Sequence, residues 1–414
     1  MTPWVRSATA SVHAAIPSPC PTASARTAAP IAVVPCWRSR TSNSIQRRSD
    51  MPRIAVDAMG GDSVPDVPVA GAVEAMSNHP ELSIVLVGPT DQIEAELSQL
   101  DHDPSRIEIC QTDEWVEMSE SPVEALRNKP NSSLSLMVKL QKEDRVDGIF
   151  SAGNTGAMVA ACTVHLKMLK GVRRPAIALP LPRGETPVML CDGGANVECR
   201  PLHLLQNAIM ADAMLRCAYS VESPRVGLLN VGSERDKGHT LAKETYQLLE
   251  ASGLDFAGNV EGGDIFNADV DVVVCDGFVG NVVLKTAEGF SESLFKTLAT
   301  ELGDGLAEQG SDVAPLKALL RSGLQKIRSR FDYSEYGGAP LLGPRGVCTI
   351  GHGRSDRKAV ANALDWTVRM IATGVQQELI ESIEREMQHL DPSTVDPSSV
   401  DPSRISQTES PTSH

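Results

Sequence analysis

The segment Gly148-Ile-Phe-Ser-Ala-Gly-Asn-Thr-Gly156 joins a short apolar run to a loop rich in Gly and Asn, and a helical pattern follows from Ala157 to about Leu169. Similar apolar runs that lead into polar loops recur at Ile54–Val56, Val188–Cys191, Val226–Leu229 and Val270–Cys275, and Ser83–Val87 is a further strand candidate. The runs are almost continuously apolar, which is typical of parallel strands buried on both faces. Repeated strand–loop–helix units predict an α/β fold with a doubly wound, mostly parallel sheet.

The composition excludes several classes of protein. The chain has 414 residues, of which 41% are hydrophobic, so global disorder is excluded. No apolar run approaches the ~20 residues of a membrane-spanning helix. A net charge of -15 argues against a nucleic-acid partner. The nine Cys form no CxxC pair, which favours reduced packing cysteines in a cytoplasmic protein.

Both ends of the chain differ from its middle. Residues 1–50 contain six Arg and one acid, are rich in Ser, Thr, Ala and Pro, and show no hydrophobic period. We expect a disordered or untranslated basic leader there. Residues 391–414 begin with three Asp-Pro-Ser repeats, which predict a disordered tail because repeated Pro prevents a helix. The folded protein is therefore expected at about 51–390.

A helical hairpin is expected within this folded part, at about 288–335. Apolar residues recur at helical spacing in Phe290–Leu306 and again in Leu316–Phe331, and the second segment has five cations and no acid. Two interpretations remain open at this point. The hairpin packs on the body or on a second subunit, or its basic face contacts a membrane surface or an acidic partner.

The polar loops are the candidate site. Ligands of doubly wound sheets bind beyond the carboxyl ends of the strands, where these loops occur. Gly lets backbone N–H groups approach a ligand closely, and a helix N-terminus adds partial positive charge. We therefore expect the loops to converge at one edge and to bind an anion or a developing oxyanion. Neutral amide donors are supplied by Asn154, Asn196, Asn230 and Asn281.

Other motifs give weaker signals. The sequence has no GxxxxGK[ST], no GxGxxG with a suitably placed acid, no GxSxG and no HExxH, so neither a cofactor nor a metal is predicted. His352 lies between two glycines after the apolar run Val347–Ile350 and is a candidate site residue. Cations expected around it are Arg345, Arg354, Arg357 and Lys358, and a further pair, Arg173-Arg174, precedes Pro175.

Five motifs resemble one family closely. They are Ile54-Ala-Val-Asp-Ala-Met-Gly-Gly-Asp62, Ser151-Ala-Gly-Asn-Thr-Gly-Ala157, Asn230-Val-Gly-Ser233, Asp276-Gly-Phe-Val-Gly-Asn-Val-Val-Leu-Lys-Thr286 and Tyr336-Gly-Gly-Ala-Pro-Leu-Leu-Gly343. In this order, over about 51–375, they resemble the bacterial acyl-ACP:phosphate acyltransferases of phospholipid synthesis. At two positions the sequence departs from the pattern of this family, with Gly193 and Pro344 where Val is the more usual residue. Both changes affect the geometry of a loop, and neither removes a functional group.

The resemblance implies a homodimer whose fold is related to phosphotransacetylases and isopropylmalate-dehydrogenase-like proteins. It implies a reversible transfer of a long-chain fatty acyl group from acyl carrier protein to inorganic phosphate. The acyl phosphate then serves a membrane acyltransferase that acylates glycerol 3-phosphate. Peripheral contact with the inner face of the membrane, or with that membrane enzyme, is a further expectation.

The chemistry of this reaction agrees with the loops. Phosphate can attack a thioester without a protein nucleophile, and a simple thiol, with a pKa of ~8.5, departs readily. The enzyme then needs only to orient the reactants and stabilise the oxyanion. The expected catalytic residues are Asn154, Asn230, Asn281, Lys285 and His352. The expected substrate-binding residues are Ser151, Gly153, Thr155, Asp192, Asn196, Gly232, Asp276, Gly277, Gly280, Arg345 and Arg354.

Three alternatives remain. A phosphotransacetylase-like enzyme that uses acyl-CoA would share the fold and the phosphate chemistry, and carrier dependence would separate the two. An NAD-linked dehydrogenase of related fold usually needs a metal held by an acid cluster, for which the sequence gives no convincing candidate. A non-catalytic protein that binds the acyl carrier is the third.

Overall fold

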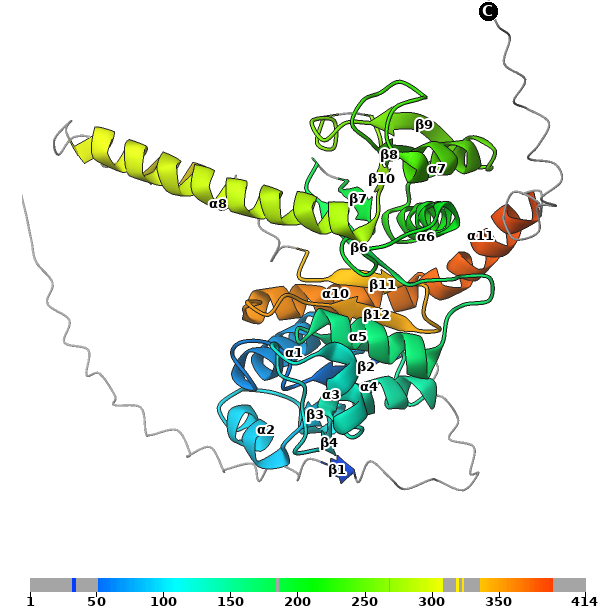
Figure 1. The fold of residues 1–414 in the computed structure, drawn as a ribbon. Coiled ribbons are helices and arrows are strands. Elements are labelled where there is room, and N and C mark those ends of the chain that lie inside the picture. Colours follow the sequence, from blue (N-terminus) through cyan, green and yellow to red (C-terminus); the bar gives the residue numbers. More distant parts are fainter. Residues whose placement is uncertain are drawn as a thin grey trace, which may run out of the picture.

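Within the part of the chain that the structure describes, twelve strands form one sheet, in the order β1-β4-β3-β2-β5-β12-β11-β6-β7-β10-β8-β9 (Figure 1). The computed structural model describes residues 32–34, 51–183, 186–267, 269–307, 318–319, 322–323 and 336–389. Figure 1 shows the early strands in the lower part of the molecule and β7 to β10 in the upper part. The sheet therefore connects two halves of the protein.

The two halves of the sheet run in opposite directions. In the first half β2 (Arg53–Asp57), β3 (Ser83–Gly88), β4 (Ile107–Gln111), β5 (Gly148–Ser151) and β12 (Val347–Ile350) are parallel. In the second half β7 (Val188–Cys191), β10 (Val272–Val274), β8 (Arg225–Leu229) and β9 (Asp255–Val260) are parallel. Between them β11 (Ala339–Leu342) and β6 (Ala176–Leu181) are antiparallel to their neighbours. Three successive antiparallel pairings reverse the strand direction.

This reversal confirms one expectation and corrects another. A mostly parallel α/β sheet is present, as the repeated strand–loop–helix units predict. The expectation that all polar loops lie at one edge is wrong, because the carboxyl ends of the two halves point in opposite directions. Helices that start at these ends must bring the loops together.

Helices cover both faces of the first half. Alternate residues of β2 face opposite ways: Ile54 and Val56 pack with α1 (Asp66–Asn78) and α10 (Arg357–Ala372), whereas Ala55 packs with α4 (Ser133–Lys142). Further cover comes from α2 (Thr90–Leu97), α3 (Pro122–Asn128) and α5 (Thr155–Ala161), and a 3-10 turn (Pro104–Arg106) precedes β4. Burial on both sides explains why the strand sequences are continuously apolar.

The second half has a more helical core. Here α6 (Pro201–Tyr219), α7 (Thr240–Glu250) and α11 (Val375–His389) pack together over β7, β8 and β10. Pro201 occupies the first turn of α6, where its missing N–H has no cost. No helix of the described residues is both long and apolar enough to span a bilayer.

The helix α8 (Gly277–Ala307) is longer than expected. It is one 31-residue helix that projects from the body, drawn in yellow-green in Figure 1. The first helix of the predicted hairpin is therefore continuous with the helix that follows β10. The predicted second helix, Leu316–Phe331, lies outside the described residues except for 318–319 and 322–323, which are helical.

A short strand from the predicted leader completes the sheet. Ala32–Val34 forms β1, which pairs in parallel with β4 and places Val34 beside Cys110. This strand was not expected, because residues 1–50 show no hydrophobic period. Cys110 is disulfide-bonded, unlike the reduced state expected from the sequence, whereas Cys162, Cys191, Cys199, Cys217, Cys275 and Cys348 are free. The rest of the leader and the tail at 391–414 lie outside the described residues.

Candidate active site

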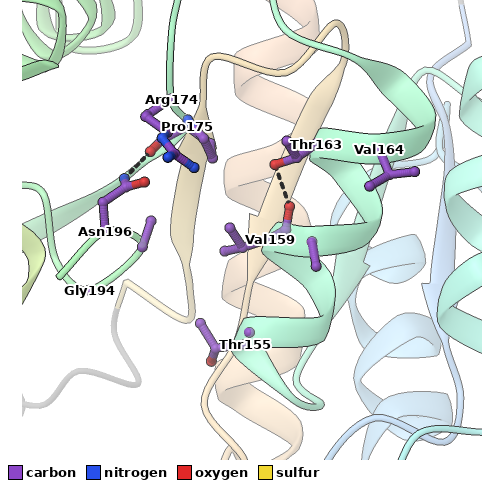
Figure 2. Close-up of a pocket in the computed structure, with 11 residues that line it drawn as sticks. Thr155, Val159, Thr163, Val164, Arg174, Pro175, Gly194 and Asn196 are labelled. Atoms are coloured by element: carbon purple, nitrogen blue, oxygen red, sulfur yellow. Dashed lines mark hydrogen bonds between the residues drawn. The ribbon is translucent and has the colours of Figure 1, made fainter. Parts of the chain in front are cut away.

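A cavity of about 320 Å³ lies between the two halves of the protein (Figure 2). One wall is the face of α5 and the turn after it, from Thr155 to Val164. The opposite wall is the segment Gly194–Asn196 after β7, together with Arg174 and Pro175 before β6. Figure 2 shows Asn196 and Arg174 facing α5 across this space. The helix α5 thus connects loops that belong to opposite edges of the sheet.

Asn154 holds the start of α5. Its Oδ1 accepts from the Ala157 N–H at 3.0 Å as the N-cap, and its Nδ2 donates to the carbonyl oxygens of Met118 and Glu120 at 3.2 and 3.0 Å. An N-cap side chain satisfies one of the unpaired N–H groups of a helix end. The amide predicted to donate to substrate therefore fixes the helix and the neighbouring 117–120 segment.

Ser151 and Gly153 are held by a buried carboxyl group. The Ser151 hydroxyl donates to Asp57 Oδ2 at 2.8 Å and accepts from the Gly153 N–H at 3.1 Å. Burial raises the pKa of Asp57, although hydrogen bonds from Ser133, Ser151 and the Met59 N–H oppose this shift. Both predicted substrate-binding residues thus shape the loop before α5, whereas Thr155 reaches the cavity.

The loop after β7 already contains its own anion. The fully buried carboxylate of Asp192 accepts from the N–H groups of Gly194, Ala195 and Asn196 at 2.8 to 3.0 Å, and from Ile177 N–H at 3.1 Å. These N–H groups face inward, so they cannot bind an external phosphate. The prediction that Asp192 contacts substrate is contradicted by this geometry.

Asn196 uses its amide nitrogen in the same loop. Its Nδ2 donates to the Pro175 carbonyl at 2.5 Å and to Asp192 Oδ2 at 2.9 Å (Figure 2). Both amide hydrogens are thereby used. Because the residue lines the cavity, its Oδ1 is the atom that can serve a ligand, as an acceptor rather than the predicted donor.

The first turn of α8 packs directly on this loop. Gly277 N–H donates to the Asn196 carbonyl at 2.8 Å, and Asp276 Oδ1 accepts from Val279 N–H at 2.9 Å. A Cβ on Gly280 would lie 1.9 Å from the Asp192 carbonyl oxygen, so only Gly permits this approach. These three predicted substrate-binding residues position α8.

Two predicted catalytic residues lie one turn apart on the same face of α8. Asn281 is exposed, and its Cβ lies 3.6 Å from where a Cβ on Gly194 would be. Its amide forms no hydrogen bond within the part of the chain that the structure describes. Lys285, four residues later, contacts His352, and residues at this spacing share one side of a helix. The face of α8 thus leads from the cavity to His352.

The second cluster contains Lys285, His352, Glu288 and Arg354. Lys285 Nζ lies 3.3 Å from His352 Nε2 and 2.9 Å from Glu288 Oε2, and Arg354 N–H approaches His352 Nδ1 at 3.2 Å. Burial lowers the pKa of His352, and the charges of Lys285 and Arg354 lower it further, whereas Glu288 acts in the opposite direction. The imidazole is therefore neutral at pH 7.

Three predicted residues lie away from this face. Asn230 closes its own turn, because its Nδ2 donates to the Lys237 carbonyl at 3.1 Å and its Oδ1 accepts from Val231 N–H at 2.8 Å. Neither Asn230 nor Gly232 lines the cavity. Arg345 lies just before β12, and its Nε donates to the Met168 carbonyl. His352 follows the other end of β12, so the whole strand separates Arg345 from His352. The expected grouping of Arg345 around His352 is therefore wrong.

Three residues of the site had no role predicted from the sequence. Asp57 belongs to a quoted motif but was given no role, and Glu288 had no signal besides its position after Lys285. Arg174 lines the cavity, and its signal was the Arg-Arg-Pro step, a cationic pair in an acidic chain. No group of His, Cys, Asp and Glu residues within the described ranges could hold a metal ion.

Comparison with known proteins decides the family. A family model described as "Fatty acid synthesis protein" matches residues 52–378. The chain is 41% identical over 335 residues to a phosphate acyltransferase of Dictyoglomus thermophilum, with 80% of this chain and 98% of the relative covered. The chain belongs to the phosphate acyltransferase family. A relative from Geotalea uraniireducens is 44% identical over 345 residues and covers 82% of this chain and 97% of its own length.

Membership has a functional and a structural consequence. The protein is an acyltransferase of lipid biosynthesis, and its family supports acyl transfer to phosphate. A phosphotransacetylase from Streptococcus pyogenes matches with a TM-score of 0.51 and 15% identity, over 78% of this chain and 95% of that one. At this identity the match shows a shared fold, which is the fold class expected from the sequence.

Proposed function

We propose that this phosphate acyltransferase transfers a long-chain fatty acyl group reversibly from acyl carrier protein to inorganic phosphate. The acyl phosphate would then serve glycerol-3-phosphate acylation in phospholipid synthesis. The observation that carries the proposal is the neutral His352 beside the ammonium group of Lys285, at the end of a helix face that starts at the cavity. This arrangement suits phosphate as the nucleophile.

The reaction needs no covalent intermediate on the protein. An oxygen of hydrogen phosphate attacks the thioester carbonyl, the C–S bond breaks, and the phosphate proton ends on the leaving sulfur. Lys285 supplies positive charge for the phosphate or for the tetrahedral oxyanion. His352 is neutral and its Nδ1 accepts from the Arg354 N–H, so its Nε2 carries the proton and can donate a hydrogen bond to the phosphate or to the oxyanion. Asn281 is the amide available to orient the carbonyl or the phosphate.

A trapping assay tests this function. Purified protein is incubated with palmitoyl-ACP with and without inorganic phosphate, and acyl phosphate is captured with hydroxylamine. Phosphate-dependent hydroxamate, with weaker activity on palmitoyl-CoA, is the expected result. Product from palmitoyl-CoA alone would replace the proposal with the acyl-CoA enzyme, and no product from either donor would leave the carrier-binding protein.

The exposed stripe of α8 supports a homodimer. Phe278, Val282, Phe290, Leu294 and Leu298 recur at helical spacing and are 60, 48, 67, 42 and 36% exposed. Thr286 interrupts this row between Val282 and Phe290, but exposed apolar residues at helical spacing on a projecting helix are typical of an interface. We propose that a second copy of the chain covers it, in a protein of the cytoplasm. Peripheral contact with the membrane, or with a membrane glycerol-3-phosphate acyltransferase, is the competing occupant.

Sedimentation separates these occupants. The Leu294→Asp variant should sediment as a monomer where the wild type is a dimer, because a charge on the stripe opposes its burial. If the wild type is monomeric, and vesicles of anionic phospholipid bind it but not the variant, the stripe is a membrane contact and the dimer proposal fails. Activity with soluble palmitoyl-ACP serves as the folding control.

A further inference from the structure

Three arginines gather beside the cavity and have no role in the chemistry described above. Arg174 lines the cavity, Arg173 precedes it, and Arg200 is the residue before α6. All three are exposed, and none forms an ion pair within the described residues. Burial lowers the pKa of His203 in the first turn of α6, and the positive charges of Arg174, Arg200 and Arg173 lower it further. The three arginines are therefore all close to the His203 imidazole.

The charge of this cluster contrasts with the rest of the protein. The whole chain carries a net charge of -15, whereas this surface presents three exposed cations close together. Glu198 lies two residues before Arg200, but the structure shows no ion pair between them. Clustered guanidinium groups bind phosphate and carboxylate with directed hydrogen bonds. An anionic partner is therefore the complement of this surface.

The cavity next to the cluster restricts the shape of that partner. Its α5 wall presents Val159, Ala160 and Val164, and the opposite wall presents Asn196 as a hydrogen-bond acceptor. A volume of about 320 Å³ is at the lower end of the range of roughly 300–1,000 Å³ for ligand sites. It suits a narrow, largely uncharged chain with one anionic group at the mouth beside Arg174.

We infer that the cavity binds the phosphopantetheine arm of an acidic acyl carrier protein, with Arg174 on the arm's phosphodiester and Arg173 and Arg200 on the carrier's acidic surface. The inference rests on the proposed function, because the same carrier delivers the acyl group. The arm would enter between α5 and Gly194–Asn196, which directs its thioester toward Asn281 on α8. A carrier fits better than coenzyme A because two of the three arginines lie outside the cavity lining.

Direct binding tests this site without relying on turnover. Fluorescently labelled holo-carrier and apo-carrier, which lacks the arm, are titrated with the full-length protein in the absence of phosphate. Arg200→Glu should weaken both carriers about tenfold, as expected for one lost charge-assisted contact. Arg174→Gln should remove most of the preference for holo- over apo-carrier, and Arg174→Lys should restore part of it.

A control variant with the same change of charge as Arg200→Glu can be made on another helix. Lys243 is exposed on α7, so Lys243→Glu should leave both affinities within about twofold of the wild type. Melting temperatures close to that of the wild type confirm that the exposed variants fold. In the turnover assay, Arg174→Gln should raise KM for palmitoyl-ACP and leave KM for inorganic phosphate unchanged.

Several results would overturn the inference. If Arg200→Glu and Arg174→Gln bind both carriers as the wild type does, the proposed carrier site is wrong. If Arg174→Gln raises only the KM for inorganic phosphate, Arg174 is a phosphate ligand instead. If the arginine variants lose as much activity with palmitoyl-CoA as with palmitoyl-ACP, and the wild type does not bind apo-carrier, the arm belongs to coenzyme A and the carrier proposal fails. Carrier binding that depends on the arginines, in a protein that forms no acyl phosphate, would refute the proposed function and keep this site.

Discussion

Lys285 Nζ lies 3.3 Å from His352 Nε2, although 67 residues separate them in the chain. Lys285 is on α8, which begins after β10 in the second half of the sheet, and His352 follows β12 in the first half. This contact therefore depends on how α8 packs between the halves. It also couples the charge of Lys285 to the protonation of His352.

Loss of the Lys285 charge should impair catalysis much more than folding. Lys285→Met removes the cation that faces the phosphate or the oxyanion, so we expect kcat to fall by roughly 10²–10³. The trapping assay measures this effect. Lys296→Met changes an exposed lysine on the same helix and should keep wild-type turnover. Equal activity of the two variants would exclude Lys285 from the reaction.

The same contact gives a prediction about pH. The positive charge of Lys285 lowers the pKa of His352 and Glu288 raises it. Lys285→Met should therefore move the His352 titration upward, toward the ordinary value of about 6.5, and Glu288→Gln should move it further down. The ring of His352, followed by NMR of labelled histidine, reports these shifts independently of phosphate. Shifts of the opposite sign would contradict the electrostatic account.

The approach of α8 to the β7 loop should be sensitive to one methyl group. Gly280→Ala places a Cβ 1.9 Å from the Asp192 carbonyl oxygen, so α8 must move away, at a cost of about 1–3 kcal/mol in unfolding free energy. Turnover should fall too, because Lys285 moves with the helix. A Cβ on Gly289 would have no other atom within 4 Å, so Gly289→Ala should stabilise the helix by up to ~1 kcal/mol. Chemical denaturation compares the pair.

The carboxylate of Asp192 should prove structural. In Asp192→Asn one acceptor oxygen becomes an N–H₂ group that faces backbone N–H donors, and we expect a loss of about 3 kcal/mol in unfolding free energy. Asp236→Asn, at an exposed loop position, should change stability by less than about 0.5 kcal/mol. A stable Asp192→Asn with a raised KM for phosphate would instead show that the carboxylate contacts substrate.

More of the fold than of the site could be predicted from the sequence, because buried strands leave a local pattern of apolar residues. The continuous apolar runs at Gly148–Phe150 and Val188–Cys191 match β5 and β7 within one residue, because burial on both faces leaves a strong local pattern. Strand direction leaves no such pattern. The antiparallel strands β6 and β11, which reverse the sheet, depend on long-range pairing such as Leu341 with Ile177. The edge at which each loop lies therefore could not be predicted.

Within the site, sequence reasoning found residues but not the direction of their hydrogen bonds. Lys285 and His352 were both predicted as catalytic residues, and the structure places them in contact. Asn154 and Asn196 were predicted as donors to substrate, yet their amides are used by the protein itself. A loop rich in Gly and Asn looks the same in sequence whether its N–H groups face a ligand or an internal carboxylate such as Asp192.

Asn154 and Asn281 should therefore respond differently to the same substitution. Asn154→Ala removes the N-cap of α5 and its bonds to the 117–120 segment, so unfolding free energy should fall by at least about 1–2 kcal/mol along with activity. Asn154→Asp keeps the cap acceptor but turns a carboxylate toward the Met118 and Glu120 carbonyls, so it should recover only part of the stability.

Asn281→Ala removes an exposed amide and should change stability by less than about 0.5 kcal/mol. Its turnover should nevertheless fall markedly, because Asn281 lies between the cavity and Lys285. Full activity in Asn281→Ala would show that α8 contributes Lys285 but no amide to the reaction.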